Sequence, residues 1–305
     1  MDLVNHLSDR LLFAVPKKGR LHQSCLDLLH GADIQFHRHS RLDIALCINH
    51  PIALVFLPAA DIPVFVGEGR VDLGITGRDQ VAESQADVEE LMELGFGKCK
   101  LQVQVPEKGP IQEPKELIGK NVVTSFTLLA TEYFASTPRA VSRAGKVDGM
   151  VTRIKYVGGS VEAACALGVA DGIVDLVESG ETMKAAGLKP IATILTTGAI
   201  LIKSKHPSNP ALVKTISSRI RGVIVAKMYV LCTYNISRDK LALVTKITPG
   251  KRAPTITQLE EEGWVAVSAM VEKKCIATVM DRLEEAGAED ILVTQISNSR
   301  SSRSI

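Results

Sequence analysis

The chain has 305 residues, of which 46% are hydrophobic, and a formal net charge of +2. This length and composition predict two or three globular domains with hydrophobic cores. The small net charge, with no long block of one sign, argues against binding to nucleic acid or to a membrane surface. The sequence has neither an apolar export signal at its start nor the roughly 18 consecutive apolar residues of a membrane span. We therefore expect a cytoplasmic protein.

The six cysteines are widely spaced and include no C-x-x-C pair. This spacing argues against a zinc site or a thiol–disulfide motif and indicates reduced thiols. The motifs G-x-x-x-x-G-K-[ST] and G-x-G-x-x-G are also absent from the sequence, which excludes two common nucleotide-binding loops. Any anion must therefore be bound by other local groups.

A basic loop follows the first predicted strand. The apolar run 11–15 predicts that strand, and apolar residues at helical spacing predict a helix from Leu21 onward. Lys17 and Arg20 lie in the loop between them. Cations at the start of a helix oppose the helix dipole, so a bound triphosphate or pyrophosphate would offset an unfavourable arrangement. The alternative is a solvated basic turn.

Strands are also expected at 52–57 and 71–76, and the second of these ends in Thr76-Gly77-Arg78-Asp79. Here a strand turns into a helix through a small residue. By itself this pattern is weak, because it could be only a helix cap. Together with the turn described next, it suggests a cleft lined by loops at the carboxyl ends of strands.

The run 170–177 is short and apolar and predicts a buried strand. Ser179-Gly180-Glu181-Thr182 follow at a strand-to-helix turn, where unpaired backbone N–H groups could bind an anion. Asp175, near the end of the strand, could accept hydrogen bonds from ribose hydroxyls while the turn holds a phosphate. The alternative is a simple N-cap, in which Ser179 satisfies helix N–H groups.

The order of the predicted elements indicates two α/β lobes with a cleft between them. Residues 1–105 and 191–227 are assigned to the first lobe, and residues 106–190 to the second. Prolines and a glycine in the turn at 106–114 indicate a hinge.

A third domain is expected at residues 228–298, because Tyr229 to Ile296 read as β-α-β-β-α-β, the order of a ferredoxin-like unit. Residues 299–305 are almost entirely polar or charged. We expect this tail to be disordered.

The segment 162–188 resembles the signature of the ATP phosphoribosyltransferases, the family that catalyses the first step of histidine biosynthesis. Residues 18–21 and 71–79 are similar to two further blocks of the family, and the likeness covers nearly the whole chain. The matching signature residues are Glu162, Gly168, Ala170, Ile173, Asp175, Leu176, Ser179, Gly180, Thr182 and Met183.

This resemblance implies an α/β fold with a bilobal, periplasmic-binding-protein-like catalytic core. The C-terminal ferredoxin-like domain is then the regulatory domain of the long form, which binds inhibitory histidine. The implied reaction joins N1 of ATP to C1 of phosphoribosyl pyrophosphate and releases pyrophosphate, with Mg²⁺ as the cofactor. The family also implies a homo-hexamer.

The resemblance assigns roles to particular residues. Asp175 would contact the ribose, and Lys17 and Arg20 the polyphosphate, as the catalytic set. No protein metal ligand is named, because Mg²⁺ would be held through the substrate phosphates. The implied substrate-binding residues are Ser179, Gly180, Glu181, Thr182, Met183, Glu162, Thr76 and Gly77. The implied histidine-binding residues are Thr233, Lys251, Thr255 and Asp290.

Two positions depart from the family pattern. Many relatives have an arginine where this chain has Pro58, so Arg20, Lys17 or Arg78 would have to supply the cation. Thr233 stands at a position that is acidic in some relatives.

Two rival functions are a non-catalytic solute-binding protein and a catalytically inactive regulatory relative.

Overall fold

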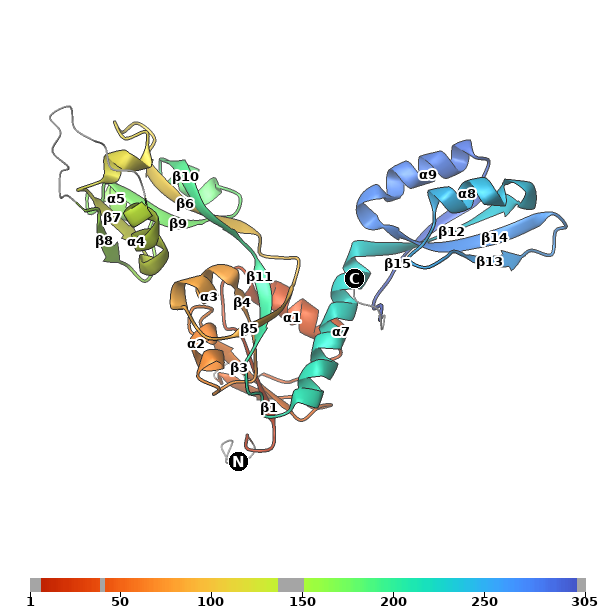
Figure 1. Cartoon of the computed structure of the whole chain (residues 1–305), viewed down its shortest axis with the longest axis horizontal. Helices are drawn as coiled ribbons and strands as arrows, with labels where there is room; N and C mark the ends of the chain where they lie inside the picture. The colour runs from red at the N-terminus through yellow and green to blue at the C-terminus, as the bar shows by residue number, and fades with distance from the viewer. Residues whose placement is uncertain (1–6, 39–41, 137–150, 301–305) are drawn as a thin grey trace. The chain divides into compact units, whose positions relative to one another are not determined.

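The computed structural model describes residues 7–38, 42–136 and 151–300 (Figure 1). The chain divides into two compact units, one of residues 1–26 and 36–213 and one of residues 27–35 and 214–305. The first unit contains two α/β lobes, and the second contains the C-terminal domain. No helix in the described part of the chain is long and apolar enough to cross a membrane.

The first lobe is built on a six-stranded mixed sheet with the order β2-β3-β1-β4-β11-β5. β1 pairs in parallel with β3 and β4, while β11 runs antiparallel to β4 and β5. Phe13, Ala14 and Val15 in β1 are fully buried, which explains why this central strand reads as a continuous apolar run. The elements are β1 (Leu11–Pro16), α1 (His22–Gly31), β2 (Ile44–Leu46), β3 (Ile52–Leu57), α2 (Ile62–Gly67), β4 (Leu73–Gly77), α3 (Arg78–Ser84), β5 (Glu89–Glu93) and β11 (Ala199–Lys203).

The second lobe is built on a five-stranded sheet with the order β10-β6-β9-β7-β8. β9 runs parallel to β7, and β7 runs parallel to β8, so their carboxyl ends share one edge of the sheet. The turn of residues 179–182, called the signature turn below, follows β9 at this edge. The elements are β6 (Cys99–Pro106), the 3-10 helix η2 (Pro114–Leu117), β7 (Asn121–Thr124), α4 (Thr127–Ser136), β8 (Arg153–Tyr156), α5 (Ala163–Ala166), β9 (Gly172–Val177), α6 (Glu181–Ala185) and β10 (Leu188–Thr197).

The chain crosses between the two sheets at residues 94–98, between β5 and β6, and again at Gly198, between β10 and β11. The segment 106–114, where we expected the hinge, instead lies inside the second lobe, where the Glu107 N–H donates to the Gly187 carbonyl (2.8 Å). β6 and β10 pair along their whole lengths in the second sheet, although the expected lobe boundaries place β6 and most of β10 in the first lobe. Alternating polarity identifies a strand but not the sheet that it joins.

A carboxylate of the first lobe caps a helix of the second. Glu83 of α3 accepts hydrogen bonds from the N–H groups of Leu128 (2.8 Å) and Leu129 (3.0 Å) and from the hydroxyl of Thr127 (3.2 Å). These are donors of the first turn of α4, which has no earlier helical carbonyls to bind. A negative charge also interacts favourably with this end of the helix dipole. Glu83 is therefore a point of attachment between the lobes.

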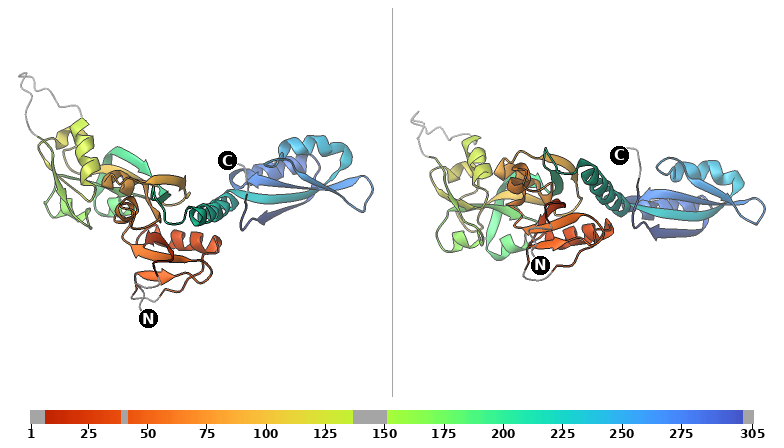
Figure 2. Two further views of the ribbon diagram at one scale, coloured as in Figure 1. Left: turned by 60° about the horizontal axis from the view of Figure 1, so that its bottom comes forward. Right: turned by 90° about the horizontal axis from the view of Figure 1, so that it is seen from below.

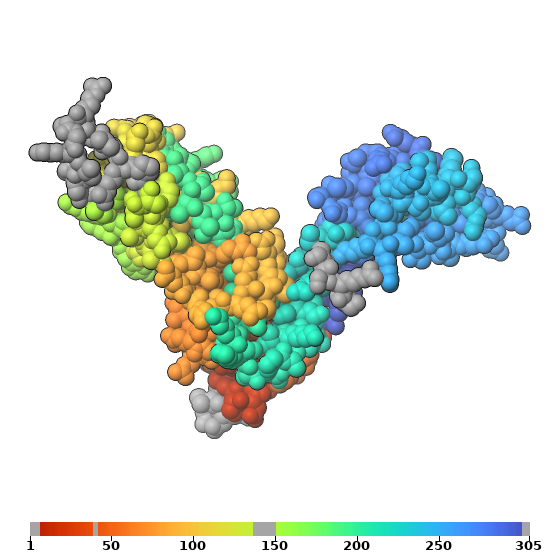
Figure 3. Space-filling view, in the orientation of Figure 1, coloured from red at the N-terminus to blue at the C-terminus, as the bar shows by residue number. Residues whose placement is uncertain are grey.

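The C-terminal domain has the predicted β-α-β-β-α-β order and the antiparallel sheet order β13-β14-β12-β15, which confirms the ferredoxin-like fold. Alternate residues of β12 point into a core with α8 and α9, which lie on one face of the sheet (Figure 2). Figure 3 shows this domain, coloured blue, as one packed body. The elements are β12 (Tyr229–Ser237), the 3-10 helix η3 (Arg238–Lys240), α8 (Leu241–Ile247), β13 (Thr255–Gln258), β14 (Trp264–Glu272), the 3-10 helix η4 (Lys273–Cys275), α9 (Ile276–Glu285) and β15 (Glu289–Gln295).

The boundary before this domain differs from the expected one at residue 228. α7 (Pro210–Met228) is one continuous helix, and the division between the units falls within it, after Val213. The end of α1 belongs to the second unit, where a Cβ on Gly31 would lie 3.0 Å from Val223 of α7. Of the tail expected to be disordered, residues 301–305 lie outside the described residues, whereas the Ser299 N–H donates to the Gly222 carbonyl (3.1 Å).

We predict that Glu83→Ala lowers the free energy of unfolding of the first unit by about 1–2 kcal/mol, because three donors at the start of α4 lose their acceptor. Glu132→Ala is the matched control, since Glu132 is an exposed glutamate within α4 itself. Urea unfolding of both variants beside the parent measures the difference. Equal losses in the two variants would contradict a capping role for Glu83.

Candidate functional site

A pocket of about 230 Å³ lies at the signature turn in the first unit. It brings Arg20, from the loop after β1, together with the turn between β9 and α6, which is more than 150 residues later in the sequence. The pocket therefore joins two segments that the sequence marked separately as anion sites. Its lining residues are Arg20, Cys99, Leu176, Val177, Glu178, Ser179, Gly180, Thr182 and Met183.

The turn itself is shaped by Gly180, which has a φ of +81°. This left-handed conformation is rarely adopted by residues with a side chain, so glycine is required here. Ser179 accepts a long hydrogen bond from the Glu181 N–H (3.4 Å), and its side chain is exposed, as is that of Thr182. Met183 is buried and anchors the turn in the core of the second lobe. The exposed hydroxyls and backbone are thus held by a buried apolar residue.

Asp175 lies two residues before the end of β9, and burial raises its pKa to about 6. The carboxylate of Glu162 raises it further, while a hydrogen bond from the Leu176 N–H (2.8 Å) opposes the shift. Glu162, another signature residue, is therefore near enough to Asp175 to act on its charge. A partly desolvated carboxylate interacts more strongly with a bound polar ligand than a carboxylate in water does.

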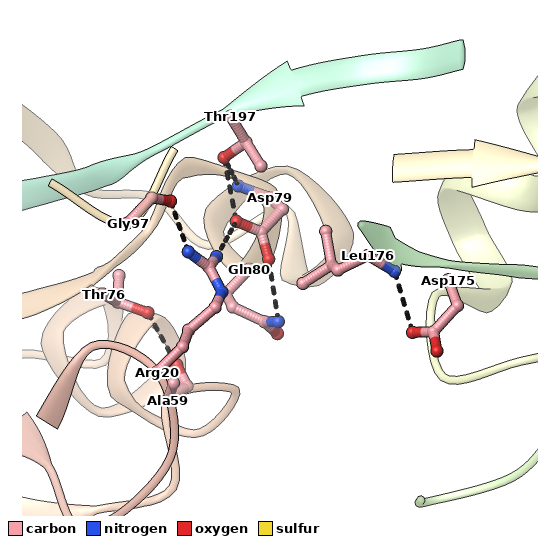
Figure 4. A network of polar contacts seen from close by, with 9 residues as sticks. All are labelled: Arg20, Ala59, Thr76, Asp79, Gln80, Gly97, Asp175, Leu176 and Thr197. Atoms are coloured by element: carbon pink, nitrogen blue, oxygen red, sulfur yellow. Dashed lines mark hydrogen bonds and ion pairs between the residues drawn. The ribbon is translucent and has the colours of Figure 1, made fainter. Parts of the chain in front are cut away.

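Arg20 is the predicted cation that reaches the pocket. Its guanidinium donates to the Gly97 carbonyl and lies 3.5 Å from a carboxylate oxygen of Asp79 (Figure 4). Its side chain is 23% exposed, so it is partly desolvated but still accessible to a ligand. Arg20 is therefore the best placed of the three cations that could replace the arginine expected at Pro58.

The other two cations are paired on the surface. Lys17 forms an ion pair with Asp43 (2.8 Å). Arg78 is held by both Glu90 (2.6 Å) and Glu93 (2.7 Å). Arg78 would have to break two charge-assisted bonds before it could bind a phosphate.

Thr76 and Gly77 have structural tasks at the end of β4. The hydroxyl of Thr76 is buried and donates to the Ala59 carbonyl (2.7 Å), which fixes the loop that follows β3. Gly77 is the N-cap of α3, and a Cβ there would lie 2.2 Å from a carboxylate oxygen of Asp79. Neither residue lines the pocket around the signature turn.

Sequence reasoning missed Cys99, Glu178, Asp79 and Thr197. Cys99 lines the pocket, and burial raises its pKa to about 11, so it is a neutral thiol rather than a nucleophile at neutral pH. Asp79 belongs to the T-G-R-D block and could have been found from it. Cys99 begins β6 and Thr197 ends β10, each next to a segment where the chain crosses between the lobes, and no local pattern marks them.

The residues implied in histidine binding lie on two parts of the C-terminal sheet. Thr255, Ser268 and Thr233 face one another in adjacent strands, and the Thr233 and Ser268 hydroxyls are 3.1 Å apart. Lys251 lies over the Tyr229 ring (4.3 Å), at the start of β12, while Asp290 accepts from Asn235 (3.0 Å), near its end.

Lys251 and Asp290 therefore contact Tyr229 and Asn235, which are six residues apart in β12. At about 3.3 Å per residue of strand, the two contacts are separated by roughly 20 Å. A free amino acid is much shorter than this distance. Within one chain, a bound histidine could contact the hydroxyls of the sheet together with one of these two ends, but not both ends at once.

The described residues contain no group of three or more His, Cys, Asp or Glu side chains placed to hold a metal ion. The carboxylate in the lining of the pocket is Glu178. This donor set fits Mg²⁺, which usually takes one or two protein carboxylates and fills its remaining positions with substrate phosphates and water.

The fold and the pocket define a two-lobed α/β protein with a candidate anion site beside a desolvated carboxylate. Residues 58–222, more than half of the chain, match the family model described as ATP phosphoribosyltransferase, and residues 226–298 match the model of the HisG C-terminal domain. The chain belongs to the ATP phosphoribosyltransferase family. Its C-terminal domain identifies it as a long-form member.

Full-length relatives agree with this assignment. The ATP phosphoribosyltransferase of Yarrowia lipolytica is 67% identical over 98% of this chain and 100% of its own length. The enzyme of Saccharomyces cerevisiae is 60% identical with the same coverage. A solved ATP phosphoribosyl transferase (HisG:HisZ) complex from Thermotoga maritima contains a chain that is similar in fold, with a TM-score of 0.58 at 22% identity, over 69% of this chain and 96% of that chain.

We predict that Asp175→Asn raises the thermal midpoint of the first unit at pH 8, because the ionised form of a desolvated acid destabilises the folded state. Since folding raises the pKa from 3.8 to about 6, this cost is complete above pH 6 and disappears below pH 4. At pH 8 the free energy of unfolding of Asp175→Asn should exceed that of the parent by about 1–3 kcal/mol.

Asp171→Asn is the matched control, because Asp171 precedes the same strand and its carboxylate accepts from the Asn121 N–H (2.9 Å). Asp171→Asn should give no such gain. Melting curves of both variants at pH 8 and pH 4 test the assignment, and a gain for Asp175→Asn that persists at pH 4 would contradict it.

Proposed function

We propose that this chain transfers the phosphoribosyl group of phosphoribosyl pyrophosphate to N1 of ATP, as the first step of histidine biosynthesis. The observation that carries the proposal is the pocket in which Arg20 faces the signature turn. The substrate carries a phosphate at one end and a pyrophosphate at the other. The pocket offers the hydroxyl-bearing turn for the phosphate and an arginine for the pyrophosphate. Family membership supports the same reaction.

In the proposed reaction, N1 of ATP forms a bond to C1 of the ribose as the bond from C1 to the pyrophosphate oxygen breaks. The electron pair of that bond leaves with pyrophosphate. Ser179, Gly180 and Thr182 hold the 5-phosphate, and Asp175 accepts from the ribose hydroxyls. Catalysis comes from holding the two substrates in line and from stabilising charge in the transition state. A covalent intermediate is not needed, and the neutral Cys99 thiol does not suit one.

The positive charge that develops on the sugar can be stabilised by the carboxylate of Asp175. Because Asp175 is partly desolvated, its interaction with that charge is stronger than it would be in water. Arg20 stabilises the negative charge on the departing pyrophosphate. Lys17 can assist only if the substrate displaces its partner Asp43.

Mg²⁺ is part of this proposal. When bound to the pyrophosphate group, it supplies Lewis-acid stabilisation of the leaving group. Glu178 is the side chain of the pocket lining that could contribute one ligand. Loss of activity on chelation with EDTA and its recovery with Mg²⁺ would test this requirement.

Turnover of ATP and phosphoribosyl pyrophosphate, followed by adduct absorbance and pyrophosphate release, tests the function. Thr182→Ala should lower kcat/KM by roughly 10- to 150-fold, because a hydrogen bond to a charged group is worth about 1.5–3 kcal/mol. Thr131→Ala is the control, since its exposed hydroxyl donates to the Thr127 carbonyl within α4. Equal kinetics for Thr182→Ala and the parent would refute the phosphate role, and absence of turnover in the parent would favour a solute-binding or regulatory protein.

The proposal also includes feedback inhibition by free histidine at the C-terminal domain. Its match to the HisG C-terminal domain and the row of hydroxyls from Thr255 to Thr233 support this part. The family resemblance further suggests a homo-hexamer, and light scattering that reported a monomer in the presence of histidine would contradict that assembly. Because both substrates are metabolites of the cell interior, we propose a cytoplasmic location, which fractionation can test.

We predict that Thr255→Ala weakens inhibition by histidine about tenfold, because the carboxylate or ammonium group of the ligand loses one hydrogen bond. Activity without histidine should not change. Thr245→Ala is the control, since Thr245 is half-buried on α8, where its hydroxyl donates to the Ala242 carbonyl, and α8 lies on the other side of the domain core. Histidine titrations at several phosphoribosyl pyrophosphate concentrations should show non-competitive inhibition, and direct competition would place the inhibitor in the catalytic pocket instead.

A further inference from the structure

Asp79 has a fully buried carboxylate beside the Arg20 guanidinium, and Figure 4 shows the contacts around it. One oxygen accepts from the Thr197 hydroxyl (2.8 Å) and lies 3.5 Å from Arg20, while the other accepts from Gln80 (3.0 Å). A buried carboxylate is costly unless hydrogen bonds and a counter-charge compensate it. Asp79 has both, and the counter-charge is the cation of the pocket.

Thr197 is bound to Asp79 by two hydrogen bonds. Its hydroxyl donates to the carboxylate and accepts from the Asp79 backbone N–H (3.0 Å). Thr197 is 3% exposed and is the last residue of β10. The side chain of Asp79 therefore has a fixed direction, set by a residue 118 positions away in the sequence.

Both segments that cross between the lobes meet at this cluster. Gly97, in the first crossing, accepts from Arg20 through its carbonyl. At the second crossing, Thr197 binds Asp79, and Gly198 accepts from the Arg78 N–H (3.0 Å). Gly97 has a φ of +64°, and a Cβ there would lie 2.9 Å from a guanidinium nitrogen of Arg20. The position of the Arg20 guanidinium therefore requires glycine at residue 97, because a side chain there would collide with it.

We propose that Asp79 is a positioning residue that, together with Thr197 and Gly97, holds the Arg20 guanidinium in the pocket for the pyrophosphate of the substrate. This inference rests on the proposed function, because it assigns Arg20 a phosphate ligand. Asp79 does not touch the substrate. Its role is to fix the direction of a group that does.

The arrangement of donors explains how this positioning works. A guanidinium has five N–H donors in one rigid plane. Among the described residues, Arg20 uses donors on its two terminal nitrogens for Gly97 and Asp79, which fixes the plane of the group. Further donors in that plane can then bind a phosphate without loss of side-chain freedom at the moment of binding. Without Asp79, the guanidinium keeps its charge and its bond to Gly97 but loses the second of the two contacts that fix its plane.

The link to both crossing segments has a further consequence. A change in the angle between the lobes must move Gly97 or Thr197, and these residues contact Arg20 directly or through Asp79. The direction of the pocket arginine is therefore coupled to the backbone that joins the lobes. Binding of the pyrophosphate end would then favour one lobe arrangement over others.

A double-mutant cycle with Arg20→Ala and Asp79→Asn tests the proposal, since asparagine keeps the volume and one oxygen but removes the charge. Asp79→Asn alone should raise KM for phosphoribosyl pyrophosphate about tenfold, as expected for one weakened charge-assisted bond. KM for ATP should stay within about twofold. In the Arg20→Ala background, the same change should have less than about a twofold effect, because the group to be positioned is gone.

Thr197→Val and Thr197→Ser provide a second test that leaves both charges in place. Valine removes the hydroxyl and should raise KM for phosphoribosyl pyrophosphate in the same direction as Asp79→Asn. Serine keeps the hydroxyl and should restore the parental value. Calorimetric titration of each folded variant with phosphoribosyl pyrophosphate and Mg²⁺ gives a readout independent of turnover.

Asp72→Asn is the matched control, because Asp72 is a buried carboxylate of the same lobe that accepts from the Leu12 N–H (2.9 Å) and does not line the pocket. It should lower stability without changing KM. If Asp79→Asn raised KM equally with and without Arg20, or left KM unchanged, Asp79 would be structural only. If Arg20→Ala itself left phosphoribosyl pyrophosphate binding unchanged, the proposed phosphate role of Arg20 would fail instead.

Discussion

The carboxylate of Asp79 is buried where the chain passes between two sheets, and other groups must stabilise its charge there. This one constraint governs the structure of the catalytic unit. Asp79 has no exposed side-chain surface, so its charge must be met by Arg20, Thr197 and Gln80. Two of these partners come from other segments of the chain: the loop after β1 and the end of β10. The same set of bonds therefore fixes the path of a crossing segment and brings a cation to the signature turn.

Asp175, which does not line the pocket but precedes its lining residue Leu176, shows how a functional group can oppose stability. Burial of Asp175 raises its pKa to about 6, so at neutral pH the folded protein holds an ionised carboxylate that is less stable there than in the unfolded chain. Nearby Glu162 adds to this cost. A residue that served only structure would be expected to gain a partner for its charge, as Asp79 does. The lack of full compensation at Asp175 is consistent with a group that interacts with a positively charged transition state.

Much of the fold could be predicted from local patterns. The order of strands and helices in the C-terminal domain was predicted correctly, because polar alternation in β12 and β14 and the turn residues between elements are local signals. The assignment of β6 and β10 to the second sheet could not be predicted, since their alternation is the same in either sheet. The hinge was expected at a proline-containing turn, but the crossings are at 94–98 and Gly198, where Gly97 permits the close approach of Arg20.

The site shows the same division between local and distant information. The turn 179–182 and the loop of Arg20 were each recognised, but their convergence depends on tertiary contacts that no spacing in the sequence encodes. In the C-terminal domain the outcome is different, because strand register separates residues that the sequence grouped together. Lys251 contacts one end of β12 and Asp290 contacts the other, with Thr233 and its paired hydroxyls between them. A ligand held by Thr233 and Thr255 can therefore have its carboxylate near Lys251 or its ammonium near Asp290, but one chain cannot satisfy both charges of a single histidine with these residues.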